Sequence, residues 1–487
     1  MTEILKAIER FLEASKDPVL CEPGEEWLAI TSENFVLEER GACTHLQAWD
    51  HRRNLVRRVT AIERETRGKL VLKVARFGNQ PGTLELIDRR RAVRDNVPLK
   101  SARLEFREQF RRFLRRQFPA YKFAELTTET DLEHSLSPAY PRALLRQGAA
   151  AWAAIGVAAE ASHPDGVLTF GLIWLDYLRR REPSLAIQGL IVYLPVAHAK
   201  TTCLRLSFLD PAVAQYCAFV FDDEGLEERV DLKDYGNLDT HLEPYRRPTR
   251  CPGVPQCEGV EKIDRSDGEL SFRVNGLEFA RTSGSELLLG LETKRASPYG
   301  KMAAFAAELS RLRSMDAPDR RNPLYLRNPE AWLESQVRRH IREIDSSLLP
   351  TPVYGQVPAF AAAERGVLDL LAVDHRGRLA VVELKASEDV HLPLQALDYW
   401  IRVQWHVKRG EFQANGYFLG SELVRDPPRL LLVSPALDVH PSNECVLRYF
   451  FPCIPVERIG VGLEWRKQLK VMLRSPQAHV NSSFPAR

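Results

Sequence analysis

The sequence has no run of about 18 apolar residues, the shortest stretch that indicates a membrane-spanning helix. Residues 1–17 are charged throughout and contain no apolar signal core, so we expect no export. Cysteine is scarce, because eight in 487 residues are too few for a disulfide framework at this size. These absences predict a cytoplasmic protein with reduced thiols and no association with a membrane.

An excess of one charge is also lacking. The 68 Lys and Arg residues and the 65 Asp and Glu residues leave a net charge of +3, which points to no class of partner. No internal repeat, heptad pattern or low-complexity segment stands out, and no Gly-rich loop ends in Gly-Lys-Ser or Gly-Lys-Thr. The sequence therefore predicts neither a coiled-coil rod nor a protein with its own NTP-driven motor.

The composition that remains is that of a packed globular protein, with 44% hydrophobic and 27% charged residues. At roughly 150 residues per domain, this length suggests about three domains. The expected fold class is α/β multidomain. We divide the chain into an N-terminal α+β region with an Arg-rich helix at 1–122, a mixed α/β domain at 123–250, a linker and β-hairpin region at 251–320, and a C-terminal domain at 321–487.

Positive charge is concentrated in residues 86–122, where twelve basic and four acidic residues give 12 − 4 = +8. Phe106, Phe110, Phe113 and Leu114 follow helical spacing there, so the sequence predicts an amphipathic helix with an Arg-rich outer face. Clustered arginines bind the phosphates of a polyanion without regard to sequence. The alternative is a solvated helix face. The candidate phosphate contacts are Arg111, Arg112, Arg115 and Arg116.

The middle sections contain elements but no catalytic constellation. Residues 167–178 form an apolar run typical of a buried helix, and strand-like runs follow at 187–194, 203–209 and 216–222. Further on, Cys251 and Cys257 could ligate zinc, but no second pair stands at metal-site spacing, and the alternative is a linker with two free thiols. The turn Asn275-Gly276 between alternating apolar residues predicts a β-hairpin.

The C-terminal section begins with a helix start signal, since Asn328 can cap a helix and Pro329 suits its first position. The apolar stripe of this helix runs through 333, 337, 341 and 344, and Glu334 lies beside it. A carboxylate at the edge of a buried face is costly unless it is paired or bound to a metal. The alternative is a glutamate at the rim that reaches water.

Two strands follow, at 367–373 and 379–385, and a tight turn at 374–377 joins them. With a three-residue loop, Asp369 is predicted to lie directly opposite Glu383. Strand side chains alternate, so Lys385 shares the face of these two carboxylates. A register slip of one residue would move Asp369 to the other face.

Two opposed carboxylates on one face need a compensating charge, because like charges across strands are destabilising. A divalent cation supplies it, and hard oxygen ligands suit Mg²⁺ or Mn²⁺. Lys385 would lie beside a metal-bound water, where it could orient or deprotonate that water or stabilise developing negative charge.

The next helix is expected at 393–409 and carries Gln395, Tyr399 and Arg402 along one polar stripe. This stripe could face the metal site or a phosphate backbone, and the alternative is exposure to solvent. Strands at 430–433 and 456–461 and a helix at 463–473 would complete the domain.

This order of elements resembles the PD-(D/E)XK nuclease superfamily, and residues 365–400 look most like its mismatch-specific endonuclease branch. The resemblance covers about 322–475 and rests on Asp369, the triplet Glu383-Leu384-Lys385 and the Gln395 helix, although Leu368 stands where many members have proline. It implies a restriction-endonuclease-like mixed sheet flanked by helices. Asp369 and Glu383 would be metal ligands and Lys385 would assist the attacking water. Glu334 and Gln395 would support the site.

The sequence therefore predicts a metal-dependent nuclease that hydrolyses phosphodiester bonds, in DNA by preference with RNA left open, in repair or defence. One alternative is a nucleic-acid-binding or regulatory protein that keeps the fold without turnover. Another is an interaction protein whose first two-thirds contacts a repair or defence component. A homodimer would suit a double-strand cut, since one active site cuts one strand.

Overall fold

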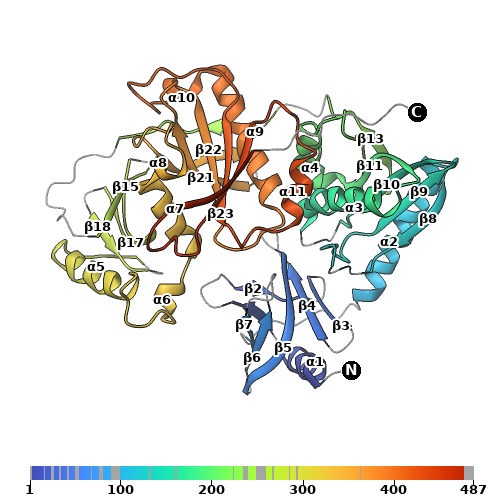
Figure 1. The fold of residues 1–487 in the computed structure, drawn as a ribbon, viewed down its shortest axis with the longest axis horizontal. Helices are drawn as coiled ribbons and strands as arrows, with labels where there is room; N and C mark the ends of the chain where they lie inside the picture. The colour runs from blue at the N-terminus through green and yellow to red at the C-terminus, as the bar shows by residue number, and fades with distance from the viewer. Residues whose placement is uncertain are drawn as a thin grey trace.

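The structure is a computed structural model. It describes residues 3–476 except 16, 23–26, 32–33, 41–42, 50–53, 67, 76–80, 89–98, 130, 132, 160, 162, 223, 234–237, 239, 248–258, 266–267, 285, 292–293 and 362–363. Within the described residues, four β-sheets with seven, six, seven and five strands are accompanied by helices. The chain is thus an α/β protein of several units, as predicted (Figure 1).

The N-terminal unit is an antiparallel sheet with one helix against it. Its elements are α1 (Glu3–Ala14), β1 (Pro18–Cys21), β2 (Leu28–Ala29), β3 (Phe35–Arg40), β4 (Cys43–Trp49), β5 (Asn54–Thr66), β6 (Lys69–Ala75) and β7 (Pro81–Asp88). The strand order is β2-β1-β7-β6-β5-β4-β3. Ile8 and Phe11 of α1 share one core with Leu70 and Leu72, alternate residues of β6 that point to the same face because strand side chains alternate.

The middle unit is a mixed sheet with helices on both faces. Its elements are α2 (Leu99–Gln117), β8 (Lys122–Thr127), β9 (Arg142–Gln147), β10 (Ala150–Gly156), α3 (Val167–Arg181), β11 (Ala186–Pro195), α4 (Ala199–Leu206), β12 (Gln215–Phe221) and β13 (Glu227–Val230). The strand order is β13-β12-β11-β10-β9-β8. The buried helix and the strands expected at 187–194 and 216–222 are confirmed by α3, β11 and β12.

The strand expected at 203–209 is wrong, because most of that stretch lies in α4. The neighbouring strands β11 and β12 run parallel. Parallel neighbours need a crossover connection, which is usually a helix. A short apolar run does not show this requirement, since it reads equally well as a strand or as one side of a helix.

The Arg-rich helix α2 is confirmed as amphipathic. Phe106, Phe110, Phe113 and Leu114 are buried against β9, β10, β11 and β12 of the middle sheet. The helix therefore packs with the unit that follows it in the chain, although it was grouped with residues 1–122. The basic residues among 89–98 lie outside the described residues, as do both cysteines considered as zinc ligands, at 251 and 257.

A small third unit contains the predicted hairpin. Its elements are β15 (Glu261–Asp264), β16 (Leu270–Val274), β17 (Leu277–Ser283), β18 (Glu286–Leu289), β19 (Arg295–Ala296), α5 (Gly300–Leu312) and α6 (Pro323–Leu326). Val274 pairs with Leu277 across the turn. Asn275 and Gly276 have φ of 45° and 78°, and a type I′ turn requires positive φ at both positions.

The C-terminal unit holds the segment with candidate chemistry. Its elements are α7 (Pro329–Arg339), α8 (Ile341–Ile344), β20 (Tyr354–Ala361), β21 (Glu364–Val373), β22 (Leu379–Leu384), α9 (Leu392–Arg409), α10 (Glu411–Ala414), β23 (Arg429–Pro435), α11 (Ser442–Leu447), β24 (Val456–Val461) and β25 (Val471–Pro476). The strand order is β20-β21-β22-β23-β24-β25, and β14 (His241–Leu242) adds to β20 at the edge. The expected strands 430–433 and 456–461 and helix 393–409 are confirmed.

Two expectations for this unit need correction. The helix expected at 463–473 is wrong, since this stretch holds turns and the start of β25, which pairs antiparallel with β24 at the sheet edge. Leu463, Met472 and Leu473 are exposed, so the apolar residues there do not form one buried stripe. The helix that begins at Pro329 is divided at His340 into α7 and α8.

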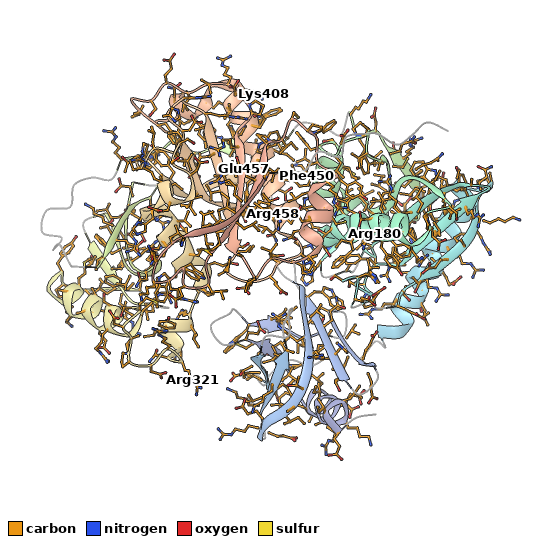
Figure 2. All side chains as sticks on the ribbon, in the orientation of Figure 1. Arg180, Arg321, Lys408, Phe450, Glu457 and Arg458 are labelled. Carbon is orange, nitrogen blue, oxygen red and sulfur yellow. The ribbon has the colours of Figure 1, made fainter. Side chains whose placement is uncertain are left out.

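One apolar core joins the middle and C-terminal units. The helices α3, α4, α9 and α11 form a shared layer between the two sheets (Figure 1). In Figure 2, Phe450 lies between Arg458 of β24 and Arg180 of α3, within this junction. The outer faces of the two sheets are covered by α2 and α7. Among the described residues, no helix has the length and apolar character to cross a membrane.

Candidate active site on the C-terminal sheet

The site is positioned by the turn between β21 and β22. The backbone N–H of Asp374 donates to the carbonyl of Arg378 at 2.9 Å, and Gly377 has φ of 82°, a left-handed value that suits glycine. The ladder pairs Val373 with Leu379 and Leu370 with Val382. This is the predicted register, and one further step places Asp369 opposite Glu383.

The two carboxylates meet on the face of the sheet that α9 covers. Oδ2 of Asp369 accepts a hydrogen bond of 2.8 Å from the backbone N–H of Leu384. Glu383 is buried, and its Oε2 has no hydrogen-bond partner among the described residues. Burial raises the pKa of Glu383, and the charge of Asp369 raises it further. A buried oxygen that lacks a donor is costly unless something else binds it.

Asp369 has the same electrostatic difficulty. Burial raises its pKa, and the negative charge of Glu334 raises it further, while Lys385 opposes the shift. The fold thus holds two carboxylates side by side in a place where neither ionises easily. Perturbed carboxyl groups of this kind are common at functional sites.

Lys385 lies among acids at the end of β22. Its Nζ is 3.5 Å from Oε1 of Glu330 and 3.5 Å from Oδ2 of Asp389. Burial lowers the pKa of the ammonium, but Glu330, Asp389, Glu383 and Asp369 raise it, and the net shift is upward. Lys385 is therefore held as a cation in this arrangement.

Glu334 is buried on α7, which begins at its Asn328 cap as predicted: the Asn328 side chain accepts a hydrogen bond from the N–H of Ala331. Glu334 does not reach water. Its carboxylate forms ion pairs with Arg338 on the same helix and with Arg273 of β16, at 3.7 Å for the second pair. The negative charge of Glu334 raises the pKa of Asp369.

Among the residues expected on the polar stripe of α9, Tyr399 has a pKa that responds to the two carboxylates. Burial raises the pKa of the Tyr399 hydroxyl, and the charges of Glu383 and Asp369 raise it further, so Tyr399 is within electrostatic range of the two carboxylates. Arg402 is partly buried and donates from Nη1 to the carbonyl of Asp398 at 3.2 Å. Gln395 is partly buried in the first turn of α9. Plain solvent exposure of this stripe is therefore wrong.

The sequence did not single out Glu330 and Asp389, the two partners of Lys385. Both stood at informative spacings. Asp389 follows Lys385 by four residues, and Glu330 precedes Glu334 by one helical turn, on the same side of α7. The signals that could have identified them were the spacing of Asp389 from the Glu-x-Lys triplet and the spacing of Glu330 from Glu334.

The four candidate phosphate contacts on α2 lie far from these acids, on the other side of the molecule in Figure 1. Arg116 bridges to Glu227 at 2.5 Å, and Arg111 to Glu108 at 3.1 Å. Arg112 and Arg115 are exposed. The structure thus does not bring the Arg-rich face and the carboxylates into one site.

The residues present fit a hard divalent cation. No group of three or more His, Cys, Asp or Glu side chains with metal-site geometry occurs in the described parts of the chain. Mg²⁺ is commonly held by one or two carboxylates, with water and substrate phosphate completing its shell. Asp369 and Glu383 supply that number, and the unpartnered Oε2 of Glu383 is a free ligand atom.

Compared with known proteins, the chain matches no family model, and no curated protein matches it. What the site can do therefore follows from its own residues.

Proposed function

We propose that the chain is a metal-dependent nuclease that hydrolyses phosphodiester bonds, with DNA as the preferred substrate. The observation that carries the proposal is the buried Glu383 with the partly buried Asp369 opposite it, where one oxygen of Glu383 has no donor among the described residues and Lys385 shares the same face. Ordinary packing does not favour two opposed carboxylates inside a fold. A role in repair or defence is part of the same proposal.

The order of elements in the C-terminal unit supports this activity. We propose that residues 323–476 form a restriction-endonuclease-like unit, in which antiparallel β20, β21 and β22 are followed by α9 and by parallel β23. A leading helix carrying Glu334, the acid on β21 and the Glu-x-Lys end of β22 stand in the order of the PD-(D/E)XK pattern.

The roles of the residues follow from their positions. Asp369 and Glu383 would hold Mg²⁺ or Mn²⁺, which supplies an activated water and stabilises charge on the scissile phosphate. Lys385, kept protonated by its acidic neighbours, orients the attacking water and offsets negative charge that develops at the phosphorus oxygens. The partly buried Tyr399 on α9 lies within electrostatic range of both carboxylates, whose charges raise the pKa of its hydroxyl.

A supporting shell keeps these groups in place. The N–H of Leu384 orients the Asp369 carboxylate, and Asp389 and Glu330 hold the ammonium of Lys385. Glu334 is itself fixed by two arginines, Arg273 and Arg338. Sites held by such outer contacts keep the geometry that catalysis needs.

One observation favours a second candidate, a nucleic-acid-binding protein without turnover. Lys385 already has two acidic partners, so part of the charge at the site is neutralised within the chain. A retained but inactive site would need no cation. Titration with Mn²⁺ separates the two functions, because only the nuclease requires binding that depends on Asp369 and Glu383.

The direct test is cleavage of labelled duplex, single-stranded, flap and mismatched DNA, and of RNA, with Mg²⁺ or Mn²⁺. Glu383→Gln and Lys385→Ala should abolish cleavage. The matched control is Glu422→Gln, at an exposed residue whose backbone carbonyl lies next to Gly377 at the turn end of the hairpin. Cleavage that persists in Glu383→Gln, or that chelator leaves unchanged, would exclude the proposed site.

A further inference from the structure

The middle and C-terminal units repeat one order of elements. The middle unit runs α2-β8-β9-β10-α3-β11-α4-β12-β13, and the C-terminal unit runs α7-β20-β21-β22-α9-β23-α11-β24-β25, if the short helices α8 and α10 are set aside. Both sheets have their strands in the same spatial order. In each sheet, neighbouring strands among the first three are antiparallel. The fourth strand is parallel to the third and the fifth is parallel to the fourth, whereas the sixth is antiparallel to the fifth.

The faces of the two sheets correspond as well. The leading helices α2 and α7 cover the outer faces. The helices α3, α4, α9 and α11 cover the inner faces within the shared core. A common order, common strand directions and common faces make the middle unit a second copy of the fold that carries the carboxylates.

Hydrogen bonds between strands fix which residues correspond. At the end of β22, Leu384 pairs with Val433 of β23. The N–H of the next residue, Lys385, donates to the carbonyl of Val433 at 3.0 Å. The N–H of Val157 donates to the carbonyl of Tyr193 at 3.0 Å, just after the paired Gly156. Val157 therefore stands in the place of Lys385.

The two acids are located by the same register. Two residues before Val157 is Ile155, in the place of Glu383, and Ile155 pairs with Arg142 on β9. Arg142 thus takes the place of Asp369. Face membership agrees, since Ile155 and Val157 belong to the shared inner core.

The middle unit has neither the two carboxylates nor the lysine at the corresponding positions. The Arg142 guanidinium donates to the carbonyls of Ser137 at 2.7 Å and Glu129 at 2.6 Å, and lies over the Trp174 ring. With a cation and two apolar side chains at the three positions, this place offers no ligand to a divalent cation. Arg142 is instead a packing and hydrogen-bonding element of the core.

The two copies pack on each other reciprocally. α4 contacts α9, and α11 contacts the corresponding α3. Leu209, after α4, forms an antiparallel bridge with Phe450, after α11. The bridge is flanked by two backbone hydrogen bonds in opposite senses, Asp210 N–H to Tyr449 at 2.8 Å and Phe451 N–H to Phe208 at 3.2 Å.

Ion pairs repeat the relationship. Arg205 of α4 meets Asp398 of α9 at 2.6 Å, and Arg448, directly after α11, meets Asp176 of α3 at 3.5 Å. Contact of one surface with its own counterpart is the mark of a two-fold interface. Here that interface lies within a single chain.

We infer that residues 99–230 are a catalytically silent copy that serves as a built-in partner, so that the chain works as a monomer with one cation site and cuts one strand per encounter. The inference rests on the proposed nuclease function and deepens it. The helix face that could join two chains of this fold is already covered by the silent copy. No homodimer is needed to complete the site.

Three measurements on the full chain test this inference. Sedimentation equilibrium should give the 55.4 kDa monomer, alone and with DNA bound to the Glu383→Gln variant. Calorimetric titration with Mn²⁺ should give one site per chain, absent in Glu383→Gln and kept in Glu422→Gln. A closed circular duplex should first become nicked, with a rate per chain that does not change with protein concentration.

The outcomes separate the two proposals. A second Mn²⁺ site that survives Glu383→Gln, a dimer that forms on DNA, or linear product formed at the same rate as nicked product would overturn the inference and leave the nuclease standing. A monomer that binds no Mn²⁺ and cuts no substrate would overturn the nuclease, and with it the single active site, while supporting the built-in partner.

Discussion

The Asp369 carboxylate accepts its hydrogen bond from the N–H of Leu384, the residue that follows Glu383. A bond from side chain to backbone thus ties the acid of one strand to the strand that bears the other acid. The two carboxylates cannot separate without breaking it. The folded protein therefore retains the repulsion between the two carboxylates. This repulsion determines how substitution and metal binding should change stability.

Replacement of Glu383 by Gln should stabilise the metal-free protein while removing activity. Relief of like-charge opposition contributes on the order of 1 kcal/mol to the free energy of unfolding. Loss of a ligand should slow cleavage by on the order of 100-fold or more, which corresponds to several kcal/mol of transition-state stabilisation. Urea unfolding in chelator and single-turnover cleavage measure the two effects. A less stable variant would show that Glu383 has a hidden partner.

Mn²⁺ should raise the thermal stability of the wild-type chain. A ligand that binds only the folded state contributes about 2.7 kcal/mol at a hundred times its Kd. Asp369→Asn should lose this gain and Glu422→Gln should keep it, with melting followed by calorimetry with and without chelator. An equal gain in Asp369→Asn would place the cation elsewhere.

The exposed arginines of α2 should contribute to nucleic-acid affinity. In a Glu383→Gln background, neutralising both Arg112 and Arg115 to Gln should lower the salt dependence of duplex binding by roughly 0.9 in log–log slope for each phosphate that the protein no longer neutralises. Arg116→Gln is the control, because Arg116 is engaged by Glu227. Titrations at several salt concentrations give the slopes. If the control changes the slope as much as the double variant, the surface acts only through its net charge.

Stability should fall in mild acid because of His391, which links α9 to Thr169 of α3 at 2.9 Å. Burial, together with charge repulsion from Arg205, His440, His163 and Lys385, lowers the pKa of His391 to about 3. Above the unfolded-state pKa of about 6.5 both states are neutral and the full stability is present. Below it the unfolded chain binds a proton that the folded chain excludes until the pH passes the folded pKa.

The expected loss for His391 is at most about 1.4 kcal/mol per pH unit between these two values. Urea unfolding at pH 7.5, 6 and 5 measures it. His391→Gln should reduce the slope of the unfolding free energy against pH by the contribution of one proton. His375→Gln, at an exposed turn position, should leave this slope unchanged. An unchanged slope in His391→Gln would assign the acid sensitivity to other groups.

The reciprocal ion pairs between the two copies should differ in strength. Arg205 and Asp398 are largely buried, with side-chain exposures of 7% and 14%, whereas Arg448 is 47% exposed. Arg205→Met should therefore cost about 3 kcal/mol, since it leaves a buried charge without its partner. Arg448→Met should cost less than about 1 kcal/mol. Equal losses in urea unfolding would mean that burial does not distinguish the two pairs.

Local features of the C-terminal unit could be predicted because local residues determine them. The Asp374–Gly377 turn sets the register of β21 and β22, and with it the face shared by Asp369 and Glu383. The Asn328 cap and the period of apolar residues mark where helices begin and which side they bury. Such signals act over a few residues, so a short stretch of sequence is enough to recognise them.

The sequence by itself thus determined the hairpin, the two opposed carboxylates with their lysine, and the apolar side of α2. Only the tertiary structure decided that Lys385 meets Glu330 and Asp389, that Glu334 meets Arg273, and that 199–206 crosses over as a helix. The silent copy was equally hidden, because a buried core requires apolar side chains of suitable size rather than particular residues. Two copies of a fold can therefore keep every strand pairing while Arg142 and Ile155 replace the acids that would have marked them as alike.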